Sequence, residues 1–339
     1  MSPEQRIIPV FVPHLGCPNN CVFCNQRKIS GAKSAPSGGE LASLIEEGLS
    51  RNAGFGEIQL AFYGGSFAAI PLREQEELLK GALPFLRDGR ISSLRVSTRP
   101  DAIDEAVLDR LERYGVKTIE LGAQSMCAQV LEASGRGHSV GATRRASELI
   151  KARGFKLILQ MMTGLPMDTK ERSIETAKEL IALKPDGVRV YPTVVLKDTP
   201  MYDMWQQGLY TPHSVEQAVD WCAEILPMFE SAGIPVIRLG LNPSEELSSG
   251  QAASGAYHPA FGELVRSRIL LDRARDLLSK ENRAGELTLL VNRSDISAMT
   301  GQKRCNVKAL AEEFPQLKIK ISAGDLPRGT VALYGENGC

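Results

Sequence analysis

The sequence predicts an α/β protein built on a partial (β/α)6-type barrel, followed by a small C-terminal α/β appendage. Short apolar runs alternate with amphipathic helical patterns at least six times in succession along the 339 residues. The segments between runs are long enough for helical crossovers between parallel strands. Because six β-then-α units are too few for a closed eight-stranded barrel, a partial barrel is expected. A doubly wound open sheet is the alternative.

Each expected strand is a short run rich in β-branched and apolar residues. The runs cover residues 7–12, 58–63, 93–97, 118–121, 156–162, 187–191 and 236–239. Each expected helix places apolar residues on one face, as Leu41, Ile45 and Leu49 do in the first. The helices cover residues 39–51, 72–85, 103–114, 140–153, 169–183 and 215–230.

Composition divides the chain into three parts, with the barrel over residues 1–240. Residues 241–282 form an extension, in which 242–260 is rich in Ser, Gly, Ala and Pro and predicts a loop, whereas 262–280 predicts a helix. Residues 283–339 predict the appendage, with strands at 287–291, 318–322 and 331–334 and helical turns near Asp295 and Ala309.

Charge gives no general case for a nucleic-acid or membrane partner, because Lys plus Arg and Asp plus Glu both number 40. No apolar stretch is long enough to span a bilayer, and the N-terminus does not resemble a signal peptide, so a cytoplasmic protein without a membrane partner is expected. The last long helix, together with cations that follow it in the sequence, could form a local phosphate-binding face, but interleaved acids favour an ion-paired surface. Its cations are Arg266, Arg268, Arg273, Arg275, Arg283, Arg293, Lys303 and Arg304.

The cysteines indicate a metal or cluster site. There are seven, an odd number, and Cys17, Cys21 and Cys24 fall within eight residues in a C-x3-C-x2-C spacing directly after the first expected strand. In a (β/α) barrel this position is the C-terminal mouth, where active sites form. Thiolates hold iron–sulfur clusters. Three ligands on a four-iron cluster leave one iron free for a small chelator, and the amino and carboxylate groups of S-adenosylmethionine fit that position.

Structural zinc is the alternative, and it requires four ligands. His14 could supply the fourth, but no second C-x2-C pair exists. The remaining cysteines are isolated and are expected to be buried free thiols. They are Cys127, Cys222, Cys305 and Cys339. This pattern favours the cluster over zinc.

The cysteine spacing, together with Tyr63-Gly64-Gly65-Ser66-Phe67 after the second strand, resembles the radical SAM superfamily. The resemblance implies a [4Fe-4S] cluster on Cys17, Cys21 and Cys24. It also implies reductive cleavage of S-adenosylmethionine to a 5′-deoxyadenosyl radical, which abstracts hydrogen from a substrate. An external reductant such as flavodoxin or ferredoxin is then expected.

Residues 8–240 also resemble the radical SAM half of the Elongator catalytic subunit, which modifies the wobble uridine of tRNA. The matching segments are 97–101, 122–125, 136–138, 185–193 and 197–205, and the oxygen-independent coproporphyrinogen oxidases share Gly164-Leu165-Pro166. A tRNA substrate is the first expectation. The compact cysteine spacing and the absence of an acetyltransferase-sized C-terminal domain from these 339 residues leave the acetyl donor open. The alternatives are a small metabolite or tetrapyrrole as substrate, or a non-catalytic iron–sulfur redox sensor or RNA-binding protein.

The resemblance assigns cofactor contacts residue by residue. Glycine backbone and serine would meet the methionine amino group, and the other side chains would contact the carboxylate or nucleoside. The assigned residues are Gly64, Gly65, Ser66, Thr98, Arg99, Gln124, Arg136 and Gln160. Each has a structural alternative: a plain turn for the glycines, a loop salt bridge or solvated position for the arginines, and a polar core for the glutamines.

Substrate-side candidates follow the sixth strand. Tyr191, Lys197 and Tyr202 fall in the Elongator-like segment, although a structured loop with aromatic packing would explain them as well. His14 and Phe23 flank the cysteines and are expected to shield the cluster.

Overall fold

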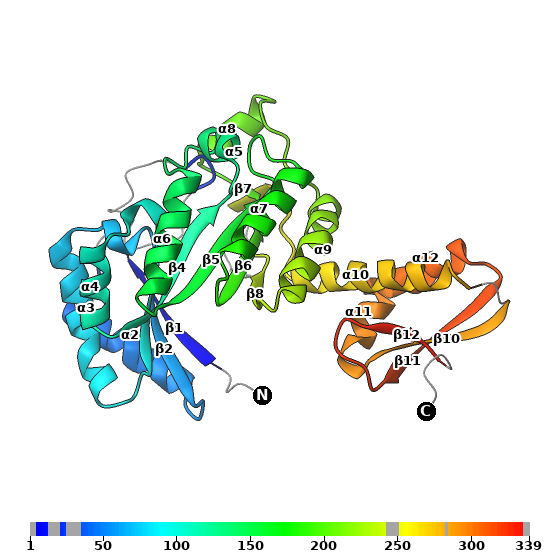
Figure 1. Ribbon diagram of the computed structural model, residues 1–339, viewed down its shortest axis with the longest axis horizontal. Helices are drawn as coiled ribbons and strands as arrows, with labels where there is room; N and C mark the ends of the chain where they lie inside the picture. Colours follow the sequence, from blue (N-terminus) through cyan, green and yellow to red (C-terminus); the bar gives the residue numbers. More distant parts are fainter. Residues whose placement is uncertain (1–4, 13–20, 25–34, 242–250, 282–283, 335–339) are drawn as a thin grey trace.

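The computed structural model of the chain describes residues 5–12, 21–24, 35–241, 251–281 and 284–334. Its centre is a curled parallel sheet of seven strands in the order β1-β2-β3-β4-β5-β6-β8 (Figure 1). The strands are β1 (Gln5–Val12), β2 (Glu57–Gly64), β3 (Ser93–Thr98), β4 (Val116–Gln124), β5 (Lys156–Thr163), β6 (Gly187–Pro192) and β8 (Val236–Leu239). The predicted partial barrel is confirmed. The doubly wound alternative is wrong, because the strand order follows the sequence without the reversal that such a sheet requires.

Helices pack against one face of this sheet and bury a continuous apolar core whose largest side chains include Phe62, Phe67 and Phe229. The helices are α2 (Gly38–Arg51), α3 (Leu72–Arg87), α4 (Glu105–Arg113), α6 (Val140–Ala152), α7 (Lys170–Ala182) and α9 (Val215–Ser231). Short 3-10 turns η2 (Phe67–Ala69) and η3 (Pro100–Ala102) follow β2 and β3. Side-chain caps fix where most of these helices begin. The capping residues are Ser37, Asp104, Ser139, Thr169 and Ser214.

Three short elements at the top of Figure 1 were not predicted: α5 (Ala128–Ala133), α8 (Pro200–Gln206) and the two-stranded antiparallel sheet of β7 (Val194–Leu196) with β9 (Ala252–Gly255). The expectation of a loop over 242–260 is therefore wrong at 252–255, while residues 242–250 lie outside the described ranges. The pairing is possible because Gly255 has φ +99° and a β-carbon there would lie 2.9 Å from the Thr193 carbonyl oxygen.

The C-terminal part folds as a separate small sheet in the order β11-β10-β12. Its elements are β10 (Gly285–Asn292), η5 (Arg293–Asp295), α11 (Ile296–Thr300), η6 (Gln302–Arg304), α12 (Cys305–Glu313), β11 (Leu317–Gly324) and β12 (Val331–Leu333). Helix α10 (Phe261–Leu278) leads from the barrel to this sheet (Figure 1), with Phe261 and Val265 in the barrel core and Leu270 and Leu278 in the appendage core.

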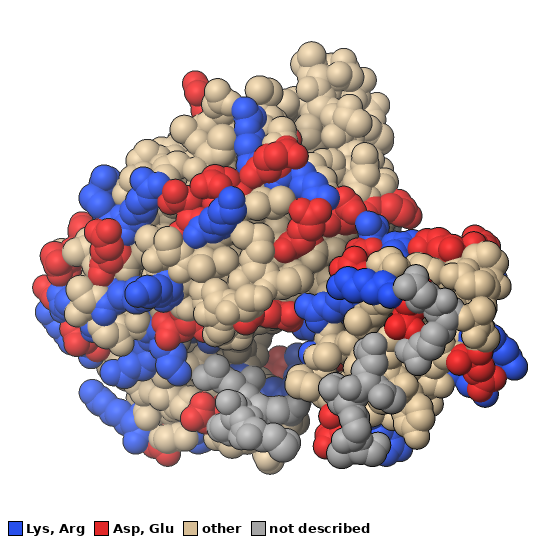
Figure 2. Space-filling model, turned by 45° about the vertical axis from the view of Figure 1, so that its right-hand side comes forward, with Lys and Arg blue, Asp and Glu red and all other residues tan. Residues whose placement is uncertain are grey.

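Charged side chains of both signs are intermixed over the face in Figure 2, as the balanced composition predicts. The arginines of α10 are mostly paired: Arg266 with Glu230, Arg268 with Asp220, and Arg275 with Glu313. The expected ion-paired surface of α10 is thus confirmed.

Among the described residues, no helix is long and apolar enough to cross a membrane.

Candidate active site

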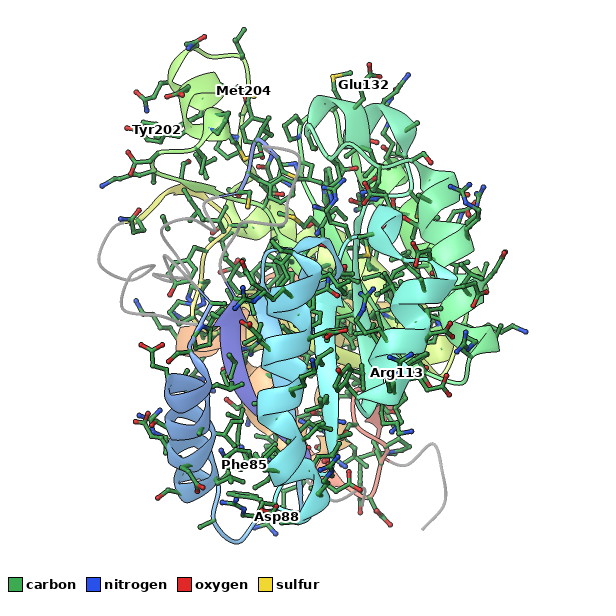
Figure 3. The ribbon with its side chains drawn as sticks, turned by 90° about the vertical axis from the view of Figure 1, so that its left-hand side faces the viewer. Phe85, Asp88, Arg113, Glu132, Tyr202 and Met204 are labelled. Atoms are coloured by element: carbon green, nitrogen blue, oxygen red, sulfur yellow. The ribbon has the colours of Figure 1, made fainter. Side chains whose placement is uncertain are left out.

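The carboxyl ends of the seven parallel strands lie at one end of the molecule, which we call the mouth. Figure 3 shows Tyr202 and Met204 of α8 and Glu132 of α5 at this end, and Phe85 and Asp88 at the C-terminal end of α3 at the opposite end. Helices that connect parallel strands run back from the mouth, so the two sets of residues mark opposite ends of the barrel.

Cys21 and Cys24 lie at the mouth on a short turn, in which the Cys24 amide donates to the Cys21 carbonyl at 3.0 Å. The turn is attached on both sides: Val22 donates its amide to Ser134 after α5 at 3.0 Å and accepts from the Met201 amide of α8 at 2.9 Å. Cys21 is buried and Cys24 half-buried. Cys17 and His14 lie outside the described residues, and within those ranges no third His, Cys, Asp or Glu joins the two cysteines.

Apolar packing holds the same turn. Val22 and Phe23 pack against a small cluster that includes Leu165, Met201 and Tyr210. Phe23 therefore packs against elements that follow β5 and β6. Its shielding role stays a prediction.

Arg136 connects the cysteine turn to β4. Its Nη1 lies 3.6 Å from Cys21 Sγ, and its Nη2 donates to the Gly122 carbonyl at 2.7 Å. Its Nε is buried without a hydrogen-bond partner. A β-carbon at Gly122 would lie 2.7 Å from Arg136 Nη2, so the guanidinium would have to shift if this residue carried a side chain. A buried guanidinium with an unused donor beside a cysteine thiol fits a site that receives an anionic cluster and a carboxylate.

The glycine segment after β2 makes a second close approach. Gly64 has φ +121°, and a β-carbon there would lie 2.3 Å from the Val12 carbonyl oxygen at the end of β1. Gly65 follows in a half-buried position. Ser66 is fully buried and bonds Thr98 through their hydroxyls at 2.8 Å, while it accepts from the Arg99 amide at 3.1 Å. The segment thus joins the ends of β1, β2 and β3.

Arg99 forms an ion pair within its own loop. It is 2% exposed and donates to Asp101 through Nε and Nη2, both at 2.9 Å. Burial alone would raise the pKa of Asp101, but the hydrogen bonds and charge of Arg99 outweigh it and lower that pKa. This is the loop salt bridge that the sequence left as the alternative.

Nearby, burial and then the charges of Arg136 and Arg99 lower the pKa of His138 to about 4.

The two predicted glutamines lie together. Gln124 ends β4 with φ +65°, and Gln160 Nε2 on β5 donates to Gln124 Oε1 at 3.3 Å. A β-carbon at Gly122 would also lie 2.9 Å from Gln124 Nε2. Gln124, Gln160 and Arg136 are thus gathered around Gly122 at the mouth.

A buried charge network in the barrel was not singled out from the sequence. Glu120 of β4 accepts from Arg95 at 2.7 Å and from the Tyr63 hydroxyl at 2.8 Å, and Arg189 Nε lies 2.9 Å from its other oxygen. Burial, followed by the charge of Glu120, raises the pKa of Tyr63. Charged residues in the middle of otherwise apolar strands were the available signal, because such strands in a parallel sheet are buried on both faces.

The substrate-side candidates are spread over neighbouring elements. Tyr191 is half-buried near the end of β6, Lys197 is exposed after β7, and Tyr202 lies on α8 in edge contact with Trp205 at 5.7 Å between ring centroids. They come from β6, from the segment after β7 and from α8. Their assignment stays a prediction.

A pocket of about 310 Å³ lies beyond the end of β5 and is lined in part by Leu165, Met204, Tyr210 and His213. Its acidic group, Asp168, accepts from the Gly164 amide at 2.8 Å and from the Ser173 hydroxyl at 2.7 Å. Burial raises the pKa of Asp168 to about 6. Because these polar groups serve the local turn, we assign no chemistry to this pocket.

The isolated cysteines differ in burial. Cys222 is fully buried and its thiol pKa is raised to about 12 by burial, as expected for an inert core cysteine. Cys127 is half-buried. Cys305 is exposed at the first turn of α12, so the expectation that it is buried is wrong. Cys339 lies outside the described residues.

Comparison with known proteins identifies the family of this chain. Residues 11–180 match the family described as the radical SAM superfamily, and residues 185–270 match the radical SAM C-terminal domain. Fold and mouth together define an enzyme of the cofactor-cleaving (β/α) barrel class. The chain belongs to the radical SAM superfamily, whose members use a [4Fe-4S] cluster and S-adenosylmethionine.

The relatives are Elongator-like over the radical SAM region. The chain is 30% identical over 184 residues to a tRNA uridine(34) acetyltransferase of Methanocaldococcus jannaschii, covering 48% of this chain and 34% of that protein. It is 28% identical over 247 residues to Elongator complex protein 3 of Homo sapiens, covering 66% and 44%. The match thus spans less than half the length of either relative. The structure of Methanocaldococcus infernus Elp3 with an N-terminal deletion superposes with a TM-score of 0.63 at 22% identity, covering 79% of this chain and 63% of that one.

Proposed function

We propose that this enzyme holds a [4Fe-4S] cluster on Cys17, Cys21 and Cys24, binds S-adenosylmethionine at the mouth, and acts on a base of tRNA. The observation that carries the proposal is Arg136, whose buried guanidinium contacts Cys21 Sγ at 3.6 Å and keeps Nε without a partner. A buried unused donor next to a thiol is costly unless an anionic group receives it. The cluster with its bound cofactor supplies a one-electron cleavage that yields a carbon radical able to abstract hydrogen.

The residues of the chain then have separate tasks. The backbone at Gly64 and Gly65 allows a close approach at the end of β2, and Gln124 and Gln160 offer amide groups suited to ribose hydroxyls. Arg136 supplies the positive charge beside Cys21. Phe23 and the apolar residues around it exclude water from the cysteine turn. Tyr191, Lys197 and Tyr202 are proposed to meet the substrate from β6 and α8.

A tRNA substrate is supported by what the relatives are named to do, and the similarity covers the radical SAM region only. The reaction also needs an electron, for which we propose a small reductant such as flavodoxin or ferredoxin. No acetyl donor is assigned, since the matched region excludes most of the length of those relatives.

Anaerobic reconstitution with iron and sulfide tests the cluster and the cofactor. The protein should become brown, and after reduction it should release 5′-deoxyadenosine and methionine from S-adenosylmethionine. Replacing Cys17, Cys21 or Cys24 by Ala should abolish both results, while Cys222→Ala should leave the iron content unchanged. A colourless zinc protein, or a coloured protein that never cleaves the cofactor, would contradict the proposal.

The substrate is tested by deuterium transfer. Total tRNA prepared with deuterated uridine should pass deuterium to 5′-deoxyadenosine when it is added to the reduced enzyme, whereas ribosomal RNA and free uridine should not. If the 5′-deoxyadenosine contained no deuterium with any tRNA fraction while cofactor cleavage was normal, the tRNA assignment would be overturned. The proposed radical cleavage of the cofactor would still hold.

A further inference from the structure

The appendage places two helices and a tight turn between parallel strands. The order is β10, α11, a turn at residues 301–304, α12 and β11, and β10 pairs in parallel with β11. Side chains of α10, α11 and α12 fill one face of this sheet, as in Leu270, Met299 and Leu310. The turn therefore joins two helices that are both anchored to the same core.

The turn is held in one shape. Gly301 has φ +76°, and a β-carbon there would lie 2.6 Å from Cys305 Sγ, so a glycine is required. Asn306, 4% exposed, donates through Nδ2 to the Ser267 hydroxyl at 2.9 Å and to the Ala298 carbonyl at 3.2 Å. These bonds tie the start of α12 to α10 and α11. The three residues between, Gln302–Arg304, project from a fixed base.

Two of the projecting residues are cations, and in the described part of the chain neither has an acidic partner. Lys303 and Arg304 are exposed, as is Lys308 one turn into α12, and within the described part of the chain none of the three forms an ion pair. This differs from α10, whose arginines are mostly paired. Lys303 and Arg304 also adopt φ +52° and +63°, a region that glycine favours, yet the sequence has two long cations there.

We propose that the turn at residues 301–304 binds the sugar–phosphate backbone of single-stranded RNA. KH modules clamp the backbone of about four nucleotides with a G-x-x-G loop, of which the turn here has the first glycine, Gly301, and carries Arg304 in place of the second. Here the required glycine opens such a turn, the cations Lys303 and Arg304 follow it, and Lys308 extends the positive surface along α12. Backbone phosphates match this charge, and the inference deepens the proposed tRNA function by giving the RNA a second contact outside the mouth.

The opposite face of the same sheet provides a matched control. Lys318 and Lys320 on β11 are exposed cations like those of the turn, but both pair with Glu286 on β10. They lie on the strand face away from the helices, because their side chains alternate with buried Leu317 and half-buried Ile319. Removing them changes the charge of the appendage by the same amount as removing the two turn cations.

The experiment measures binding of a fluorescent eight-nucleotide oligouridine to the anaerobic, cluster-loaded full chain, at several salt concentrations. The test variant is Lys303→Asn with Arg304→Gly, because asparagine and glycine accept positive φ and remove the charge without straining the turn. The control is Lys318→Gln with Lys320→Gln. The test variant should bind about tenfold more weakly, and its salt slope should fall by about 1.4, the value for two lost contacts to a single strand. The control should bind as the unchanged chain does.

Several results would overturn the inference: no binding by the unchanged chain, equal binding by the test variant, a loss as large in the control, or equal binding of duplex RNA. Arg304→Gly alone replaces a residue with φ +63° and should fold at least as well as the unchanged chain. Its salt slope should fall by about half as much as in the double variant. Deuterium transfer from tRNA separates the two proposals. Transfer without turn-dependent binding leaves the proposed function standing, and turn-dependent binding without transfer leaves the RNA site standing.

Discussion

Arg136 is the single residue that most directly connects the cysteine turn with the strands. Its guanidinium reaches Cys21 Sγ at 3.6 Å from a position 115 residues further along the chain. Hydrogen bonds and charge near a cluster sulfur set the reduction potential, because the reduced cluster carries one more negative charge than the oxidised one. A buried cation at this distance should therefore favour reduction.

Arg136→Gln should lower the midpoint potential of the reconstituted cluster by about 60 mV, the one-electron equivalent of ~1.4 kcal/mol. Arg136→Lys retains the charge and should shift the potential less. An anaerobic redox titration followed by electron paramagnetic resonance measures both. Arg144→Gln, an exposed arginine paired with Glu179 on the outside of the barrel, is the control and should leave the potential unchanged. An unchanged potential in Arg136→Gln would show that the guanidinium does not act on the cluster.

His138 should make the stability of the fold depend on pH. Burial and the neighbouring cations Arg136 and Arg99 lower its pKa from 6.5 to about 4, so the fold favours the neutral ring. This stabilisation is fully present above pH 6.5 and is lost as the pH falls toward 4, with a total on the order of 3 kcal/mol. Urea unfolding at pH 7.5 and pH 5 should detect the loss, and His138→Gln should reduce the pH dependence. An identical pH dependence in the variant would contradict the assignment.

Single residues could be proposed from the sequence where the chemistry is local. The cysteine spacing and the glycine pair lie within short segments, so a spacing of a few residues was enough to propose a ligand set, and that set stays a prediction. The partners of Arg99 and Arg136 were not predictable to the same degree. Arg99 donates to Asp101, two residues away, whereas Arg136 contacts Cys21 across the mouth. The sequence alone does not indicate whether an arginine will bind a neighbour in its own loop or a residue far away in the chain.

Helix α8 is the element that couples the substrate side to the cysteine turn. Thr199 caps it by accepting from the Tyr202 amide at 3.1 Å and donates to the Leu196 carbonyl at 2.7 Å. The Met201 amide of the same helix donates to the Val22 carbonyl at 2.9 Å. Loosening the start of α8 should therefore loosen the turn that carries Cys21 and Cys24.

Thr199→Val should remove the cap at a cost of ~1 kcal/mol and speed amide exchange about fivefold in α8 and in residues 21–24. Hydrogen–deuterium exchange followed by mass spectrometry measures both segments. Ser139→Ala is the control, because it removes a comparable cap at the start of α6, where Ser139 accepts from the Ala142 amide at 3.2 Å. Faster exchange confined to α8, or faster exchange of residues 21–24 in the control, would contradict the coupling.

The elements that sequence analysis missed share a physical cause. α5, α8 and β9 have six, seven and four residues, too short for a periodic pattern to be distinguished from a loop. Helices of this length are marginal in isolation and are stabilised by tertiary contacts. The long amphipathic helices and the strands with continuous apolar runs were predictable for the opposite reason, since their own sequences specify which face is buried.

At the level of the whole molecule, the sheet was predicted as an incomplete barrel because its strands alternate with helices in a regular order. What the alternation does not reveal is how the strands are held together on the inner face. There the carboxylate of Glu120 on β4 contacts three side chains from other strands: Tyr63 of β2, Arg95 of β3 and Arg189 of β6. The network thus links four of the seven strands across the barrel.

Glu120→Gln should destabilise the whole sheet by about 3 kcal/mol or more, because it leaves Arg95 and Arg189 buried without their counter-charge. The amide keeps the size of the side chain, so lost packing does not explain the effect. The control is Glu112→Gln, since Glu112 is 53% exposed and shares Arg153 with Glu105 and Asp109, and its cost should stay below about 0.5 kcal/mol. Urea unfolding of both variants measures the difference. A cost for Glu120→Gln as small as that of the control would mean that solvent screens the two arginines, and the barrel interior would then be a hydrated channel in which their charge is available to an anionic ligand.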